Sequence, residues 1–195
     1  MMDVLVVVAH PDDEIIWAGG FILQNLGWDW TVLCLCRSDD TDRSRKFRSV
    51  CAALGSTGLM SDLDDGSPLK PIDPRREIGD RIMSIAEDTG WDLCLTHGEN
   101  GEYGHQRHKE VHCEVRGLFE NGMLKCKELW TFAYCCSVRS GVCRADEGAE
   151  IVVELTDKQL AEKKRIVRDE YGYAEDSFEV KACVSPEAFR RQRMK

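Results

Sequence analysis

The 195-residue sequence has no apolar run long enough to cross a membrane and no excess of positive charge. A transmembrane helix needs about 20 consecutive apolar residues. The apolar run near the amino terminus is interrupted by His10, Pro11 and Asp12, and no basic segment precedes it. These features exclude a signal peptide of the usual pattern. We therefore expect no membrane span and a cytoplasmic location.

The charge balance is acidic, with 26 Lys and Arg against 35 Asp and Glu and a formal net charge of −9. A broad nucleic-acid or anionic-membrane surface needs clustered positive charge, so this balance argues against both kinds of partner. Residues 190–195 are a basic exception, Arg-Arg-Gln-Arg-Met-Lys. We predict that they form a solvated end.

The chain holds ten cysteines, but none is spaced as Cys-x-x-Cys. This absence argues against a cysteine-rich metal site. Free cysteine behaves as a small hydrophobe, and a cytosolic compartment keeps thiols reduced. We predict buried free thiols at Cys34, Cys36, Cys51 and Cys94. Three cysteines in less apolar surroundings are predicted to be redox-labile: Cys135, Cys136 and Cys143.

Predicted strands and helices alternate along the chain. The strands cover residues 4–8, 29–36, 59–63, 91–96, 129–134 and 151–155. The helices cover residues 14–26, 43–54, 73–90, 105–121 and 156–172, the last of them ending near a glycine. This alternation is typical of right-handed βαβ units, so we predict an α/β three-layer sandwich with a mostly parallel, Rossmann-like sheet. No internal repeat or linker divides residues 1–195, which predicts a single domain.

The most informative motif is Ala-His-Pro-Asp-Asp-Glu at residues 9–14, directly after the first predicted strand. The strand is a continuous apolar run, as in strands buried on both faces of a parallel sheet. Ligands of open α/β sheets bind outside the carboxyl ends of the strands. Asp12 or Asp13 is also suited to cap the following helix. Capping needs one acid and no histidine, so the motif as a whole favours a chemical role.

A second motif, Tyr-Gly-His-Gln-Arg-His at residues 103–108, follows the predicted strand 91–96 and begins a helix. It therefore belongs to the same edge of the sheet as His10. His105 and His108 are three residues apart and share one helix face. His108 and His112 are four apart, a spacing that would also let these two share a metal. The alternative is that these are ordinary structural histidines, which we favour for His112.

Two imidazoles and a carboxylate with further positions open to water are the equipment of a hydrolytic metal site. Zinc sites of this kind use three protein ligands, and the metal lowers the pKa of its water to about 7. A neighbouring carboxylate that does not bind the metal is suited to act as general base. The sequence therefore predicts a metal-dependent hydrolase.

The first motif, followed by Gly19 and Gly20 and paired with a distant Gly-His-x-x-His, resembles the LmbE-like (PIG-L) de-N-acetylase family. Asp-Gly at residues 65–66 and Thr-His at residues 96–97 also fall where this family tends to have them. The resemblance covers about residues 3–112. Members of the family remove acetyl groups from N-acetylglucosamine-containing compounds.

The resemblance implies a ligand set and a division of roles. His10, Asp13 and His108 would hold zinc, with another divalent metal such as Fe²⁺ as the alternative. The resemblance further implies these roles for other residues: general base for Asp12, polarisation of the substrate carbonyl for His105 with help from Tyr103, and substrate contacts for Arg43 and Asp65.

The sequence departs from the family pattern at Gln106 and Arg107, where the family commonly has Pro-Asp. The missing acid would orient His105 and raise its pKa. Glu99 and Glu102, in the loop before the motif, are candidates to replace it. Lys46 also occupies the place of a family acid in the helix that begins near Arg43.

We therefore expect a zinc-dependent de-N-acetylase that acts on an N-acetylated sugar or sugar conjugate. One alternative is a metal- or ligand-binding module that has lost catalysis, which the departures at residues 46, 106 and 107 would favour. Another is hydrolysis of a non-sugar amide at the same site. Whether the protein is a monomer or a homo-oligomer stays open.

Overall fold

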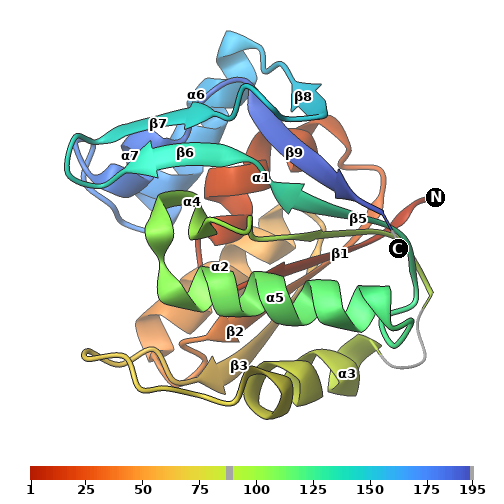
Figure 1. The fold of residues 1–195 in the computed structure, drawn as a ribbon. Helices are drawn as coiled ribbons and strands as arrows, with labels where there is room; N and C mark the ends of the chain where they lie inside the picture. The colour runs from red at the N-terminus through yellow and green to blue at the C-terminus, as the bar shows by residue number, and fades with distance from the viewer. Residues whose placement is uncertain (87–89, 194–195) are drawn as a thin grey trace.

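A computed structural model describes residues 1–86 and 90–193 and shows a seven-stranded sheet between two layers of helices (Figure 1). In sheet order the strands are β3 (Thr57–Leu63), β2 (Asp29–Cys36), β1 (Asp3–Val8), β4 (Trp91–Thr96), β5 (Cys126–Phe132), β9 (Glu187–Gln192) and β8 (Ile151–Val153). The first five are parallel, and β9 and β8 are antiparallel to their neighbours. The predicted mostly parallel α/β sandwich is confirmed.

The central strand β1 divides the interior into two cores. Because successive side chains point to opposite faces, Val4 and Val6 lie in one core while Leu5 and Val7 lie in the other. The first core is covered by α1 (Asp13–Gln24), α2 (Thr41–Ala53) and the π-helical turn η2 (Ile166–Glu170), and α6 (Asp157–Arg165) packs against α1. The second is covered by the turn η1 (Arg75–Gly79), α3 (Asp80–Ala86) and α5 (Gln106–Glu120).

Most predicted elements are present with shifted ends. The predicted strands 29–36 and 91–96 match β2 and β4, and the predicted helix 105–121 matches α5 to within one residue at each end. The end of the predicted helix 73–90 falls partly outside the described residues. No helix in the described part of the chain combines the length and apolar character needed to span a bilayer.

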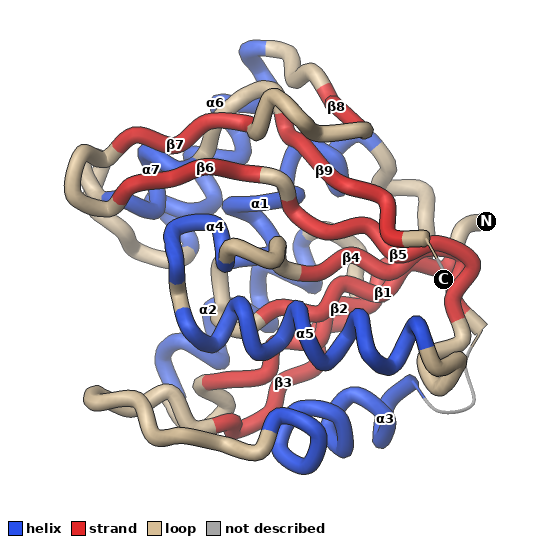
Figure 2. Tube along the Cα trace, viewed as in Figure 1, coloured by secondary structure: helices blue, strands red, loops and turns tan. Residues whose placement is uncertain are grey.

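A hairpin and two short helices escaped prediction. The hairpin consists of β6 (Tyr134–Ser137) and β7 (Val142–Ala145), and it packs against α4 (Gly101–Gly104) and α7 (Phe178–Ala182) (Figure 2). The helix beginning near Thr156 is therefore not the last, contrary to prediction. In the hairpin, Cys136 and Cys143 lie opposite each other and form a disulfide. Cys136 and Cys143 were both predicted to be redox-labile; their pairing could not be predicted from the sequence, because strand pairing brings the two side chains together.

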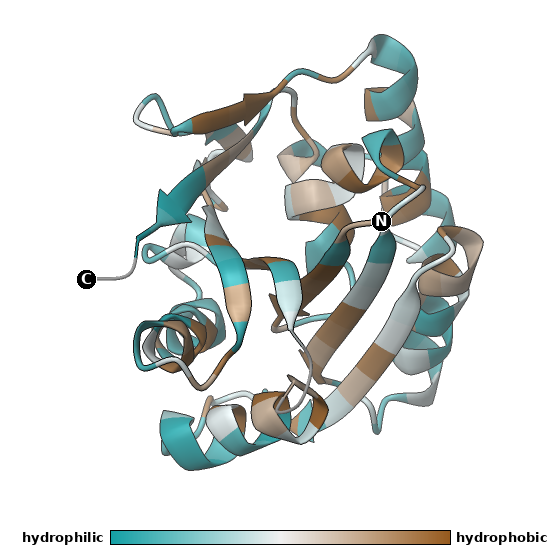
Figure 3. Ribbon diagram, turned by 90° about the vertical axis from the view of Figure 1, so that its right-hand side faces the viewer, coloured by the Kyte–Doolittle hydropathy of each residue, from teal (hydrophilic) through white to brown (hydrophobic). Residues whose placement is uncertain are grey.

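The carboxyl-terminal segment is also a correction. The predicted solvated end contributes instead to β9, whose backbone pairs with β5 on one side and β8 on the other. Phe189 is fully buried, while Arg190 pairs with Asp146 at 2.9 Å and Arg191 with Glu128 at 3.2 Å. The hydrophilic half of the strand is visible in Figure 3. The basic residues of β9 gave no apolar pattern typical of a strand, so the strand, which backbone pairing stabilises, was not predicted.

The parallel topology gathers polar residues at one edge of the sheet. His10 follows β1, Arg37 follows β2, Asp65 follows β3 and His97 follows β4. The carboxyl ends of parallel strands lie at the same edge, so these side chains are brought together even though the chain separates them.

Candidate active site

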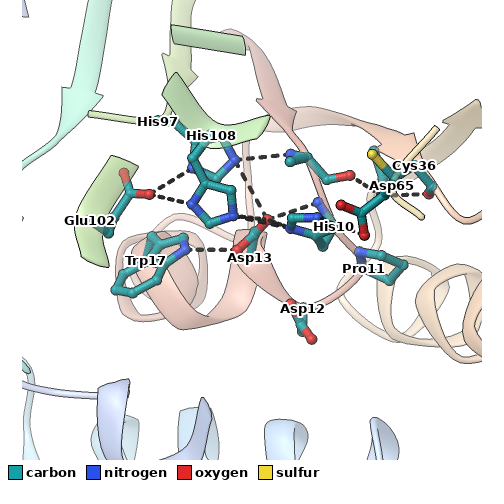
Figure 4. A network of polar contacts seen from close by, with 12 residues as sticks. His10, Pro11, Asp12, Asp13, Trp17, Cys36, Asp65, His97, Glu102 and His108 are labelled. Carbon is teal, nitrogen blue, oxygen red and sulfur yellow. Dashed lines mark hydrogen bonds and ion pairs between the residues drawn. The ribbon is translucent and has the colours of Figure 1, made fainter. Parts of the chain in front are cut away.

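The three residues predicted to hold a metal meet at this edge (Figure 4). His10 Nδ1 lies 3.2 Å from Asp13 Oδ2 and 3.0 Å from His108 Nε2, and His108 Nε2 lies 3.4 Å from Asp13 Oδ2. All three residues are buried. They come from the loop after β1, the first turn of α1 and the first turn of α5.

The outward-facing nitrogens of both imidazoles have carboxylates beside them. His108 Nδ1 donates to Glu102 Oε2 at 2.6 Å, which leaves the lone pair of its Nε2 facing inward. His10 Nε2 lies 3.3 Å from Asp65 Oδ2, within ion-pair distance although not aligned for a hydrogen bond. A proton on His10 Nε2 is thus stabilised by Asp65, and its Nδ1 lone pair then also faces inward.

This donor set fits a divalent metal. Two imidazole lone pairs and one carboxylate oxygen converge, which is the ligand chemistry that zinc accepts. Ligands at the usual zinc bond lengths of about 2.0–2.2 Å are about 3.3–3.6 Å apart in a tetrahedral site. The distances of 3.0–3.4 Å between the three donor atoms approach that range.

His97 is a second candidate ligand, because one of its ring nitrogens lies near Asp13 and His108. Its Nε2, however, accepts a hydrogen bond from the backbone N–H of Ala9 at 2.9 Å. The ring must then be protonated on Nδ1, which donates to Glu102 Oε2 at 3.0 Å. With its lone pair occupied, His97 packs against His108, and their ring centroids are 3.8 Å apart.

Metal content distinguishes these candidate sets. We expect purified protein to carry about one divalent ion per chain, most of it zinc, and His108→Ala to abolish it. His97→Gln should retain the ion, because its amide can accept from Ala9 and donate to Glu102. Elemental analysis measures both. The structural histidine variant His112→Ala serves as the control, since His112 donates Nδ1–H to the His97 carbonyl at 2.8 Å. Metal loss in His97→Gln with retention in His108→Ala would contradict the assignment.

The Asp12 carboxylate points away from this cluster (Figure 4). The residue has a φ of 114°, and its side chain forms no helix-capping hydrogen bond. It accepts hydrogen bonds from Tyr173 Oη and, at 3.1 Å, from Arg43. Burial, with the negative charge of Asp13 adding to it, raises the pKa of Asp12 to about 7. The two adjacent carboxylates therefore face different partners, and the capping alternative is wrong for Asp12.

His105 lies immediately before α5, with its Nδ1 buried and lacking a hydrogen-bond partner among the described residues. Burial lowers its pKa to about 4, and the neighbouring His108 and His10 act in the same direction. The ring is therefore neutral at pH 7. The rings of His10 and His105 are nearly perpendicular, in a T-shaped contact with centroids 4.7 Å apart.

Neither of the two acids proposed to support His105, Glu99 and Glu102, takes that role in the structure. Glu102 instead contacts His97 and His108, so the suggestion that it orients His105 is wrong. Glu99 is exposed. Arg107, one of the departures from the family pattern, is fully buried and pairs with Glu110 at 2.5 Å. It also donates to the carbonyls of residues 64 and 70, and so fixes the loop that carries Asp65.

The motif residues His10, Asp12, Asp13 and His105 border a cleft of about 180 Å³. Its lining includes all the predicted catalytic and substrate residues, together with three aromatic rings that the prediction did not include, those of Trp17, Tyr173 and Phe178. The complete lining consists of His10, Asp12, Asp13, Ile16, Trp17, Arg43, Asp65, Tyr103, His105, Tyr173, Phe178 and Glu179. His108 lies behind this surface, fully buried. Tyr173 carries no motif of its own, and no local signal pointed to it. Glu102 could be recognised in the sequence as an acid close to the second motif, but the sequence did not indicate that it contacts His97 and His108.

Comparison with known proteins adds the family. The family model described as "PIG-L: GlcNAc-PI de-N-acetylase" matches residues 5–118, more than half of the chain and both motifs. The chain belongs to the PIG-L family. This assignment confirms the resemblance on which the predicted roles depend.

Two curated proteins are similar to part of this PIG-L chain at about a quarter of identical residues. An uncharacterized protein, L374, from Acanthamoeba polyphaga mimivirus is 25% identical over 126 residues, covering 56% of this chain and 54% of its own. A 1D-myo-inositol 2-acetamido-2-deoxy-alpha-D-glucopyranoside deacetylase from Corynebacterium diphtheriae is 26% identical over 151 residues, covering 59% and 51%. The chain spans about half the length of the curated relatives it matches.

Among solved structures, the 4-carboxy-2-hydroxymuconate hydratase GalB from Pseudomonas putida KT2440 is similar over 100% of this chain and 98% of its own. The TM-score is 0.67 at 15% identity, so the likeness supports the fold alone. A hydratase with this fold also means that the fold by itself does not specify the reaction.

Proposed function

We propose that this protein is a metal-dependent hydrolase, with zinc as the expected metal, that removes an N-acetyl group from an amino sugar or sugar conjugate. We further propose that residues 1–195 form a single domain with this activity. One observation carries the proposal: the inward-facing donors of His10, Asp13 and His108 meet beside a cleft lined by Asp12, a carboxylate that does not join them.

A metal held by these three residues would supply Lewis-acid polarisation and ease deprotonation of the attacking water. Asp12 would accept the proton that the water loses as it attacks the acetamide carbon. Arg43 and Tyr173 hold the Asp12 carboxylate, which lines the same cleft as His10 and Asp13. As the C–N bond breaks, the same proton would pass to the leaving nitrogen, giving acetic acid and an amine, which ionise to acetate and an ammonium group.

The carbonyl oxygen gains negative charge during this attack, so it needs a preorganised donor. We propose His105, whose neutral ring lines the cleft while its Nδ1 is buried, as that donor. Tyr103 borders the same cleft, with its ring centroid 5.7 Å from that of His105, and would assist at the oxyanion.

Substrate contacts are proposed for Arg43 and Asp65, which also line the cleft. Asp65 is also held by Arg37 at 2.7 Å and stands against His10, so it would orient that histidine as well. Trp17 and Phe178 supply apolar surface next to these polar groups. Apolar walls with a few polar groups are the usual composition of a small-molecule site.

Acetate release tests the proposal directly. We expect a panel of N-acetylated sugars and conjugates to include substrates from which the protein releases acetate. A chelator should abolish the release and added zinc should restore it, because the metal is held by only three side chains. N-acetylated amino acids in the same panel are the control for a non-sugar amide. Acetate from those compounds alone would replace the sugar assignment. Metal binding without any hydrolysis would favour the module that has lost catalysis.

A further inference from the structure

Three N–H groups point at the carboxylate of Glu102, which is fully buried. Figure 4 shows the two that come from His97 and His108. The backbone N–H of Gly98 donates to Oε1 at 2.7 Å. The Nδ1 atoms of His97 and His108 lie 3.0 and 2.6 Å from Oε2. A carboxylate accepts through both oxygens and donates through neither, so it satisfies all three donors at once.

The backbone around Glu102 is built to hold the side chain there. Glu102 has a φ of 57° and a ψ of −57°, in the left-handed half of backbone space that favours glycine. The side chain of Asn100 holds this turn by accepting from the backbone N–H of Glu102 at 3.1 Å and donating to the Tyr134 carbonyl at 2.8 Å. A long side chain kept in such a conformation marks a functional constraint.

We propose that Glu102 is a positioning residue that sets the tautomer of His108. By accepting from Nδ1–H, it leaves the Nε2 lone pair of His108 facing His10 and Asp13. This inference rests on the proposed function, because it needs a metal at those three residues. Carboxylates behind metal-binding histidines commonly act in this way. The particular feature here is one carboxylate oxygen shared by two stacked imidazoles.

His97 fixes which groups donate and which accept in these hydrogen bonds. Because Ala9 N–H occupies its Nε2, His97 can only donate to Glu102 through Nδ1. The Oε2 atom of Glu102 must therefore be an acceptor, and His108 Nδ1 must be a donor. The backbone at the end of β1 thus acts through His97 and Glu102 on a residue of α5.

An amide cannot replace this carboxylate. Glutamine has the same shape, but it has one accepting oxygen and an NH₂ group that only donates. If the NH₂ group faces the imidazoles, His108 has to move its proton to Nε2, where it opposes metal binding. If it faces Gly98, two N–H groups meet without an acceptor.

The test compares Glu102→Gln with Glu99→Gln, the same change at an exposed acid in the same loop. Competition with a chromophoric chelator measures the zinc affinity of each protein. We expect Glu102→Gln to bind zinc about 10–100-fold more weakly than the wild type and Glu99→Gln to bind it as the wild type does. The variant Glu102→Asp keeps a carboxylate, so its affinity should lie closer to that of the wild type.

A spectroscopic measurement separates positioning from general loss of structure. The ¹⁵N shifts of the imidazoles in the metal-free protein report which nitrogen is protonated. We expect Nδ1–H for His97 and His108 in the wild type, and Nε2–H for His108 in Glu102→Gln. The wild-type spectrum alone decides the inference even if Glu102→Gln does not fold: an Nε2–H tautomer of His108 overturns it.

The outcomes also separate this inference from the proposed function. If the wild type binds no zinc, the proposed function fails first. If the wild type binds zinc and Glu102→Gln binds it equally tightly with the same tautomer, the role of Glu102 is wrong while the proposed function stands.

Discussion

Replacing Asp12 by Asn is expected to lower the rate of deacetylation by about 10²–10⁴-fold, the usual contribution of a general base. The metal should remain, because the Asp12 carboxylate faces Arg43 and Tyr173 and not the donor cluster. Asn keeps the size of the side chain and removes its ability to take a proton. Turnover and zinc content measured on the same preparation give the answer.

A matched control is Asp39→Asn, the same substitution at an exposed position, which should change neither quantity. Loss of zinc from Asp12→Asn would mean that Asp12 is a ligand. The roles of Asp12 and Asp13 would then have to be exchanged.

Replacing His105 by Ala is expected to lower turnover by about 10²–10³-fold, the usual cost of removing one oxyanion donor. Zinc should remain, because the three proposed ligands, the imidazoles of His10 and His108 and the carboxylate of Asp13, do not include His105. Since the His105 ring is neutral down to about pH 4, it should contribute no step near pH 6.5 to the pH–rate profile. The measurements are zinc content and the rate at several pH values.

His112→Ala is the comparison for this variant and should keep both zinc and turnover. If His105→Ala loses its zinc, His105 is a ligand and the place of His108 has to be reassigned. If it keeps full activity, the second motif is structural, and the proposed enzyme loses its main support beyond the metal.

The sequence alone was enough to predict the layered fold and the edge at which the site lies. The apolar run of β1 and the alternation of strands with helices have local causes, since periodicity and burial are written into neighbouring residues. Parallel strands then bring the residues that follow β1 and β4 to one edge. For this reason, His10 and His108 could be predicted to approach each other although 98 positions separate them.

The order of strands β9 and β8 at one end of the sheet could not be predicted from the sequence. β9 has a basic half without apolar periodicity, and only its backbone pairing with β5 and β8 makes it a strand. The disulfide between Cys136 and Cys143 likewise depends on the register of a hairpin. Backbone pairing leaves no signature in side-chain composition, so these features required the tertiary structure.

The partners of the site residues were also decided only by the tertiary structure. Tyr173 reaches Asp12 across 161 positions of the chain, and Glu102 turns to His108 and His97. His105 keeps a buried nitrogen that has no partner in the described part of the chain. Residue types and spacing determine which groups can reach the edge of the sheet. Which hydrogen bonds form there depends on the backbone angles of the loops and on the packing around each group, such as the positive φ of Glu102.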